Sequence, residues 1–188
     1  MSRRRQRGSA VIETALTLGV ILSSGLFAAD LYHLLRARAD LERSASDLAG
    51  TLANQKALTF DGVQKLVAGM QAERGDRYEF QVGKVLRSGK VQWQLPLGSA
   101  SGLCDNPLQG TEYTGELPEQ DQPDADSDSV ALLVVHACQA SGELEMDSLL
   151  LANSTLQVTS VQRLRSADIE LDEALSALAG IDYQGSDD

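Results

Sequence analysis

The chain is poor in the residue types that build most catalytic and metal centres. Its 188 residues include two histidines, two cysteines and one tryptophan, and aromatic residues make up only 4%. It has no Gly-x-Ser-x-Gly motif, no phosphate-binding loop and no paired carboxylates at the end of a predicted strand. There is no Cys-x-x-Cys motif and no Cys/His cluster in the sequence that would suggest zinc. These absences predict a protein that is not an enzyme and has no cofactor and no metal.

Proline is absent between Ser9 and Leu95, so nothing in the covalent backbone interrupts a long N-terminal helix. Leucines recur three, four and seven residues apart along it, which predicts one helix of about 45–50 residues with an apolar stripe. We expect this stripe to pack on the chain's own domain and on neighbouring helices. A coiled-coil dimer is the alternative, although Arg38 and Ala45 would make a poor seam. The leucines are Leu31, Leu34, Leu35, Leu41, Leu48 and Leu52.

Formal charge is absent from residues 14–29. A helix from Ser9 to Ala29 is roughly 31 Å long, close to the hydrocarbon thickness of a bilayer, and a helix satisfies its own backbone polar groups in lipid. The residues before this segment are basic, so the positive-inside rule predicts a cytoplasmic N-terminus and an exported remainder. The basic residues are Arg3, Arg4, Arg5 and Arg7.

Positive charge is scarce in the remainder of the chain. The formal net charge is −11, and without the four leader arginines 12 basic residues face 27 acidic ones, for a charge of −15. A domain of this charge repels phosphate groups, which excludes nucleic acid as an expected partner. Outside the membrane segment roughly 130 residues remain, enough for one domain with its own core.

Glu13 is the one carboxylate inside the apolar segment. A charged group at mid-bilayer costs about 2.5–3.5 kcal/mol, and less near the interface. One interpretation is that Glu13, close to the cytoplasmic end of the segment, extends its side chain to the headgroups. The other depends on its spacing, because Glu13 becomes the fifth residue if the chain is cut after Gly8.

Residues 3–13 read Arg-Arg-Arg-Gln-Arg-Gly-Ser-Ala-Val-Ile-Glu. This arrangement resembles the processing site of type IV prepilins, and the form Gly-Ser-Ala-Val-Ile-Glu is most similar to the TadE/TadF minor pseudopilins of the tight-adherence (Tad) pilus system. The resemblance is specific from Arg3 to about Ala29 and covers less than a third of the chain.

The resemblance implies that a prepilin peptidase cleaves between Gly8 and Ser9. It also implies a single-pass inner-membrane subunit with its C-terminal domain in the periplasm, which joins an adhesive pilus. Its partners would be other pilins or pseudopilins and the inner-membrane assembly platform. In such a subunit Glu13 would neutralise the new α-amino group of Ser9, on its own or on a neighbouring chain.

Three alternatives remain open at this point. An ordinary signal peptide has an apolar core of about 7–15 residues and a small-x-small cleavage site, to which residues 26–30 are a loose match. The chain could also be a non-polymerising bitopic protein whose periplasmic domain binds a partner, or a pseudopilin of type II secretion.

The cysteines, Cys104 and Cys138, both lie in the predicted exported part. In an oxidising compartment one even pair predicts one disulfide. Closing a loop of about 35 residues stabilises a fold by roughly 3–4 kcal/mol on the chain-entropy model.

The predicted fold class is α+β, with the long helix packed on a small antiparallel sheet as in pilins. We divide the chain into a cleaved leader (1–8), a transmembrane helix (9–30), its extension (31–57), a periplasmic domain (58–183) and a disordered tail (184–188). Residues 96–129 hold all four prolines and many acidic groups, and predict a solvated loop. A calcium site at Asp124, Asp126 and Asp128 is disfavoured, because Ser129 and Val135 stand where an EF-hand needs Gly and Glu.

Within the domain, apolar spacing predicts a short helix from Val63 to Met70 that stops near Gly75. Alternation predicts a β-hairpin of residues 78–82 and 91–95, in which Trp93 is a core residue and not a ligand platform. A continuous apolar run at 130–138 predicts a central strand with His136 in the core or on the sheet face. Residues 155–164 predict another strand, and 168–179 a last helix.

Overall fold

The computed structural model describes residues 6–72, 78–118, 130–140, 155–166 and 168–183. Its longest element is helix α1, Gln6–Ala53, of 48 residues. By contacts the chain divides into two units, 1–37 and 38–188, and the boundary falls inside α1. The predicted long helix is therefore confirmed, and it ends four residues before the expected limit at 57.

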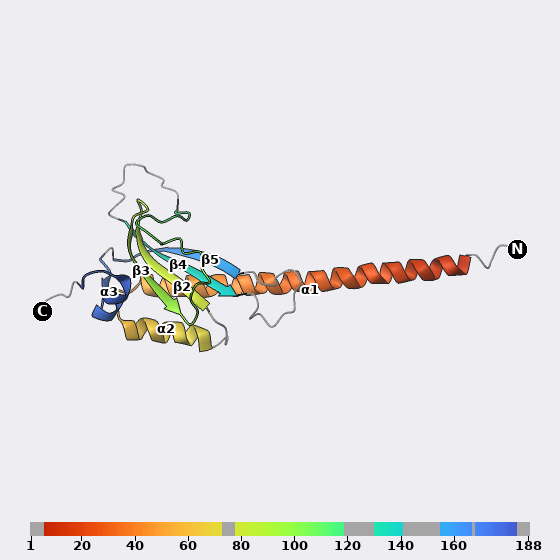
Figure 1. The fold of residues 1–188 in the computed structure, drawn as a ribbon, viewed down its shortest axis with the longest axis horizontal. Helices are drawn as coiled ribbons and strands as arrows, with labels where there is room; N and C mark the ends of the chain where they lie inside the picture. Colours follow the sequence, from red (N-terminus) through yellow and green to blue (C-terminus); the bar gives the residue numbers. More distant parts are fainter. Residues whose placement is uncertain (1–5, 73–77, 119–129, 141–154, 167, 184–188) are drawn as a thin grey trace. The chain divides into compact units, whose positions relative to one another are not determined.

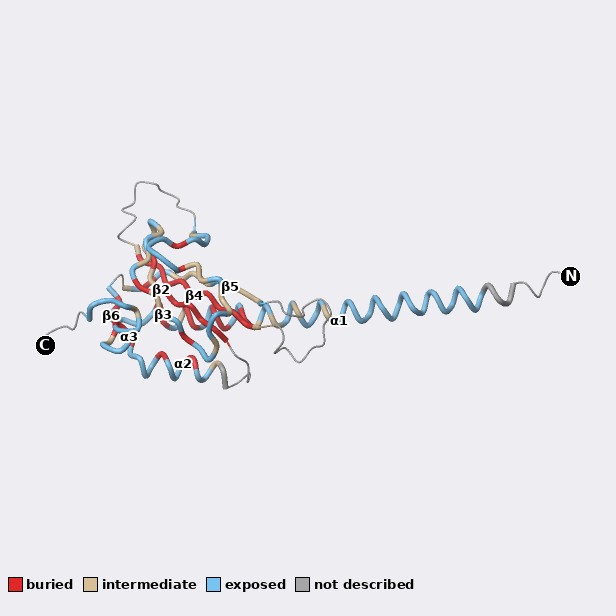
Figure 2. The backbone as a smooth tube through the Cα atoms, viewed as in Figure 1, coloured by how far each residue is buried: buried red, intermediate tan, exposed pale blue. Residues whose placement is uncertain are grey.

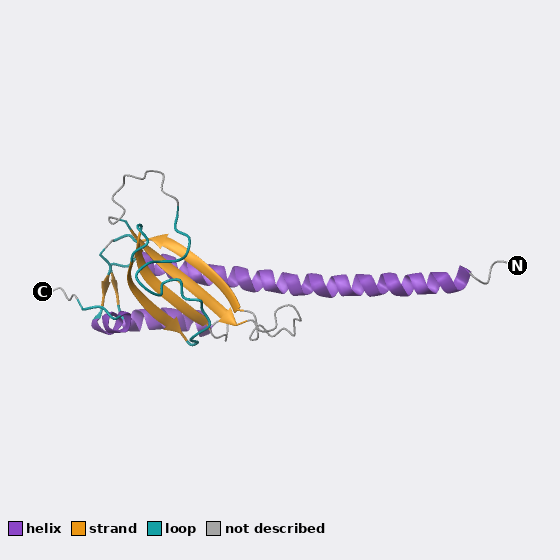
Figure 3. Ribbon diagram, turned by 45° about the horizontal axis from the view of Figure 1, so that its top comes forward, coloured by secondary structure: helices purple, strands orange, loops and turns teal. Residues whose placement is uncertain are grey.

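The unit from Arg38 onward contains a four-stranded antiparallel sheet in the order β3-β2-β4-β5 (Figures 1 and 3). This confirms the α+β class. Strands β2 and β3 form the predicted hairpin around Gly89, whose positive φ of 91° suits the turn. The strands are β2 Tyr78–Leu86, β3 Val91–Gly98, β4 Ala131–Ala140 and β5 Thr155–Arg163.

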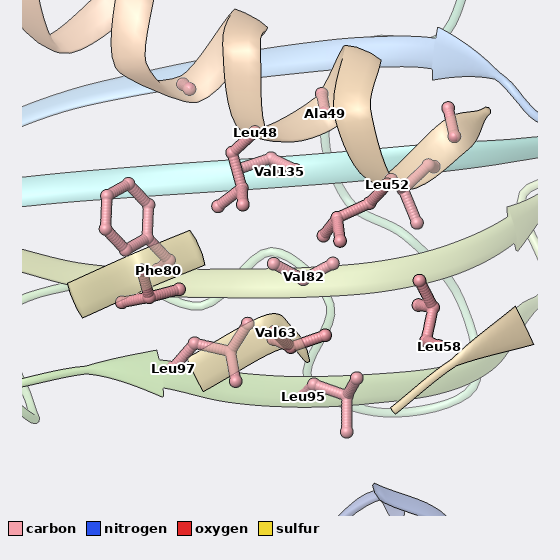
Figure 4. Packing of buried hydrophobic residues seen from close by; sticks show 14 of the residues in the cluster. Leu48, Ala49, Leu52, Leu58, Val63, Phe80, Val82, Leu95, Leu97 and Val135 are labelled. Carbon is pink, nitrogen blue, oxygen red and sulfur yellow. The ribbon is translucent and has the colours of Figure 1, made fainter. Parts of the chain in front are cut away.

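One face of this sheet packs against the apolar stripe of α1. Leu41, Leu48 and Leu52 are each at most 3% exposed. Figure 4 shows Leu48 and Leu52 lying over Val135 and the neighbouring strand residues. Their spacing of seven and four residues keeps them on one side of the helix, so the stripe packs on the chain's own domain as predicted. Helix α2, Phe60–Ala72, adds residues to the same core, which confirms the second predicted helix.

The opposite face of the sheet is covered by the segment that follows β3. Leu108 is fully buried against Val85 and Val134, and Tyr113 joins this second cluster. A Cβ on Gly83 would lie 2.8 Å from a methyl of Leu108, so glycine allows the close approach. With both faces covered, β4 is buried over nearly its whole length, as its continuous apolar run predicts (Figure 2).

The prediction of one helix over residues 168–179 is wrong. Glu170–Leu171 is instead strand β6, which pairs in parallel with β1, Ala57–Leu58. Helix α3 begins only at Glu173 and ends at Ala179. The spacing of apolar residues suggested one buried helical face, but these residues do not share a face. Leu171 is buried as part of strand β6, whereas Leu178 on α3 is 43% exposed.

Asp172 explains why the last helix begins where it does. One carboxylate oxygen accepts the N–H of Leu175 at 2.8 Å as an N-cap, and the other accepts the N–H of Phe60 at 2.6 Å. A single side chain thus satisfies free donors at the starts of both α3 and α2.

The predicted loop 96–129 begins later than expected, because β3 continues through Pro96 to Gly98. Proline is tolerated there since β3 is an edge strand, where a missing N–H need not break a ladder bond. The acidic run at 119–129, the predicted stop of the second helix near Gly75 and the tail 184–188 lie outside the described residues.

We predict that Leu48→Ala lowers the free energy of unfolding by about 2–5 kcal/mol, because it removes a fully buried side chain and leaves a cavity in the main core. Denaturant titration of the full chain in detergent measures the change.

Leu178→Ala is the matched control, since it makes the same substitution at an exposed helical site. It should change stability by less than about 0.5 kcal/mol. Equal effects of the two substitutions would contradict the packing described for α1.

Candidate functional site

The first candidate region is the N-terminal part of α1, residues 6–37, which belongs to the first unit. Its large apolar side chains are exposed, with Val11 and Leu26 at 70% and 73%. So many exposed large apolar side chains in one segment are rare in water-soluble proteins. The helix is long and apolar enough to span a membrane. The exposed residues are Val11, Ile12, Leu16, Leu18, Val20, Ile21, Leu22, Leu26, Phe27, Leu31, Tyr32 and Leu35.

The hydroxyl groups in this segment are satisfied by the helix itself. Thr14 donates to the carbonyl of Ala10 at 2.8 Å, and Thr17 donates to that of Glu13 at 3.0 Å. Ser23 and Ser24 both donate to the carbonyl of Val20. Since these side chains need no outside partner, they add little to the free energy of placing the segment in lipid.

Helix α1 includes Gly8, Ser9 and Glu13, the residues of the predicted processing site. Ser9 and Glu13 are four residues apart, which places them on one face of the helix. The Glu13 side chain is exposed, and no described basic group lies within 4.0 Å of it. Glu13, which has no basic partner among the described side chains, thus lies one helical turn from Ser9, the expected new amino terminus.

The second candidate region is a polar patch on the outer face of the sheet, the face opposite α1. It lies beneath the described part of the loop that follows β3, residues 99–118. Cross-strand pairing aligns Glu79 with Cys138 and Gln81 with His136. Alternation along each strand turns these side chains away from the α1 core, which takes Phe80 and the other intervening residues. Thr159 of β5 continues the row beside His136.

Glu79 is the anchor of this patch. It is 5% exposed, and its Oε2 accepts the backbone N–H groups of Leu103 at 2.5 Å and Cys104 at 3.2 Å. Its Oε1 accepts from the amide of Gln81 at 2.6 Å. Charge-assisted bonds to a carboxylate are among the stronger hydrogen bonds, so they hold the loop on the sheet.

Cys104 and Cys138 form a disulfide with their Cα atoms 5.5 Å apart, as the sequence predicted. The bond joins the loop to the central strand next to the Glu79 contacts. It closes a loop with a sequence separation of 34. A cross-link of this span stabilises a fold by roughly 3–4 kcal/mol on the chain-entropy model.

His136 is 7% exposed, which confirms its predicted place on the sheet face. Its Nδ1 lies 2.8 Å from Thr159 Oγ1, whereas Nε2 has no hydrogen-bond partner among the described residues. Burial lowers the pKa of the imidazole below 6.5, opposed by the nearby Gln157 side chain and then by the charges of Asp105 and Glu79. No hydrogen bond of acceptable geometry joins Gln157 to Nε2. The ring is therefore neutral at neutral pH.

This pKa shift predicts a pH-dependent stability. Because the unfolded chain binds the proton at higher pH than the folded chain, the contribution of His136 is complete above about pH 6.5 and decreases as the pH falls toward the folded pKa. Denaturant titrations between about pH 7.5 and 5 should show wild type losing stability faster than His136→Asn.

His33→Asn, in the other unit, is the control and should retain the wild-type pH profile. An unchanged profile in His136→Asn would contradict the assignment.

The structure brings together a group that the sequence analysis did not expect. A ring nitrogen of His136 and the Sγ atoms of Cys104 and Cys138 all lie within 4.8 Å of one another. A local signal did exist, because His136 and Cys138 are two apart in a strand and so share a face. The position of Cys104 depends on the loop, which leaves no periodic signal. In the structure the two sulfur atoms are bonded to each other as a disulfide, so neither is a thiolate that could bind a metal.

A cavity of about 610 Å³ lies at another edge of the same unit. Trp93 contributes to its wall but is only 6% exposed and belongs to the main core, as predicted. Burial lowers the pKa of Lys84, and the charge of Asp168 opposes the shift. The lining residues carry charges of both signs, and no ligand class follows from them. They are Lys84, Gln92, Trp93, Asp168, Ile169, Glu170, Leu171, Ser176, Gly180, Ile181 and Asp182.

Comparisons with protein-family models, with curated proteins and with solved structures found no match to this chain.

Proposed function

We propose that this chain is a minor pseudopilin, a membrane-anchored structural subunit for the assembly of a Tad-type pilus. The observation that carries the proposal is the composition of α1. In one helix it combines the Gly8/Glu13 spacing, an exposed apolar segment long enough to span a bilayer, and a C-terminal stripe that forms the core of a folded unit. A pilin needs all three in that order.

The proposed topology follows from charge. The leader arginines precede the apolar segment and stay cytoplasmic, while the remainder, with its formal charge of −15 without them, crosses to the periplasm. An oxidising periplasm suits the disulfide between Cys104 and Cys138.

Processing would require the first turn of α1 to open, because a peptidase binds its substrate as an extended chain. Gly8 favours this opening, since glycine in a helix is about 1 kcal/mol less favourable than alanine. Its lack of a side chain also suits a narrow peptidase subsite. Cleavage would then leave Ser9 as the amino terminus, one helical turn before Glu13.

The charge pair of Ser9 and Glu13 would act during assembly. In the free subunit Glu13 lies near the headgroup region and can reach water at little cost. In a bundle of subunit helices that water is excluded, and the α-amino group of Ser9, on the same or a neighbouring chain, becomes its partner. Removing one member of a buried pair costs about 3–5 kcal/mol because the other charge is left uncompensated.

We assign no catalytic role to the folded unit. Among the described residues, the buried carboxylate of Glu79 holds the loop, and the half-buried carboxylate of Asp172 caps two helices. A non-polymerising bitopic protein and a type II secretion pseudopilin remain the alternatives. Cleavage after Gly8 would distinguish a pseudopilin from a non-polymerising bitopic protein. The identity of the subunits that co-purify with the chain would distinguish a Tad pseudopilin from a type II secretion pseudopilin.

We predict that Gly8→Val blocks cleavage between Gly8 and Ser9 and accumulates the uncleaved precursor, because a branched side chain does not fit the peptidase subsite. Mass spectrometry of the N-terminus of membrane-extracted protein measures the outcome. Gly19→Val, at a helical position with open space around it, is the control and should be processed normally. A wild-type chain that keeps Met1 in cells with an active pilus system contradicts the proposal.

We predict that Glu13→Ala inserts into the membrane and is cleaved as well as wild type, but enters pili at least about a hundredfold less, which corresponds to the lower end of the broken-pair cost. Membrane level, N-terminal mass and co-purification with other pilins measure the three steps.

Glu42→Ala removes a carboxylate from an exposed part of the same helix, where Glu42 pairs with Arg38, and serves as the control. Normal piliation by Glu13→Ala would show that the carboxylate has no role in assembly. Failed insertion would show that it acts earlier.

A further inference from the structure

We propose that reduction of the Cys104–Cys138 disulfide converts the cluster of half-buried Cys104 with buried His136 and Cys138 into a zinc-binding site. The three candidate ligand atoms already lie within 4.8 Å of one another. Two thiolates and an imidazole are a common donor set for Zn²⁺, with a fourth position left for a carboxylate or water. This inference concerns the folded unit alone and stands whether or not the chain is a pilus subunit.

One nitrogen of the imidazole is held by another side chain and the other is not. Thr159 Oγ1 holds Nδ1 at 2.8 Å, which leaves Nε2 as the nitrogen available to a metal. His136 as a residue is 7% exposed, and no described residue gives Nε2 a hydrogen bond. A buried polar atom without a partner is unusual, and metal-binding histidines commonly have their other nitrogen fixed by a second residue in this way.

The two cysteines have supports that do not depend on the bond between their sulfurs. Cys138 lies within β4, which is paired on both sides. Cys104 is held by its own N–H and that of Leu103, both of which donate to Glu79. Reduction therefore leaves both thiols close together beside the imidazole.

A metal site requires the two sulfur atoms to separate after reduction. Tetrahedral zinc has Zn–S distances of about 2.3 Å, which places the two sulfurs about 3.8 Å apart and the nitrogen nearer to each. Rotation about the Cα–Cβ bonds of the reduced cysteines would supply this separation from Cα atoms that lie 5.5 Å apart.

The fourth ligand would be a water or, after a movement of its side chain, the carboxylate of Asp105. Asp105 follows Cys104 directly in the chain, but its carboxylate is not among the ligand atoms that lie within 4.8 Å of one another, and its Oδ2 lies 3.4 Å from the amide of Gln157. Glu79 is less available, because it accepts three hydrogen bonds that hold the loop.

The chemistry balances with a dithiol as the reductant. Thiol–disulfide exchange converts the protein disulfide to two thiols and the dithiol to its own disulfide. Zn²⁺ then replaces the two thiol protons, which pass to solvent, and forms two Zn–S bonds. Zinc suits the site better than a redox-active copper ion, because it binds thiolates without oxidising them again.

The test uses the full chain in detergent, oxidised or reduced with a phosphine that does not itself bind the metal tightly. Co²⁺ serves as a spectroscopic substitute for Zn²⁺, because thiolate ligands give charge-transfer bands that carboxylates do not. We expect one metal ion per reduced chain, thiolate–cobalt bands that Zn²⁺ removes, and no such bands in the oxidised chain.

The matched variants are His136→Asn, Thr159→Val and His33→Asn. We expect His136→Asn to weaken zinc binding at least about a hundredfold and Thr159→Val, which leaves the ring unsupported, about tenfold. His33→Asn should bind as wild type does. A competing zinc chelator measures these affinities.

Near-UV circular dichroism of the buried Trp93 monitors folding during the titration. If the reduced chain loses its fold, Zn²⁺ should restore the signal. The proposal is overturned by a reduced, folded chain without thiolate–cobalt bands, by a reduced chain that zinc fails to refold, or by wild-type affinity in His136→Asn.

Discussion

The packing of the α1 stripe on the sheet is the constraint on which the rest of the folded unit depends. Leu41, Leu48 and Leu52 are almost completely buried, and the inner faces of β2, β3 and β4 close around them. Residues 38–53 are therefore an integral part of the core of this unit.

The outer face of the sheet is covered by a loop and not by a helix. The segment after β3 has little regular structure, and the described part of it is attached at a few points: the Glu79 carboxylate, the disulfide and the buried Leu108 side chain. Each attachment removes a buried polar group or an apolar surface from water. His136 differs from its neighbours, because one of its nitrogens takes no part in this network. That difference is why the cluster suggests chemistry beyond structural support.

Both candidate regions depend on the same electrostatic rule. A charge in a medium of low dielectric is tolerated when hydrogen bonds or an opposite charge replace water. Glu79 meets this requirement inside the folded unit through three N–H donors. Glu13 has no such donor among the described residues, so in lipid its carboxylate needs headgroup water or, in the assembly proposed above, the α-amino group of Ser9.

The sequence by itself determined the elements in which apolar residues follow a regular pattern. The leucine spacing identified α1, the alternation identified the β2–β3 hairpin, the apolar run identified β4, and two cysteines allowed only one disulfide. Only the tertiary structure decided the β1–β6 pairing, since two-residue strands have no period to detect. The same holds for Asp172, which bonds a residue 112 positions away, and for the meeting of Cys104 with His136. Such contacts are set by strand register and by the path of a loop over the sheet, and neither leaves a local pattern in the chain.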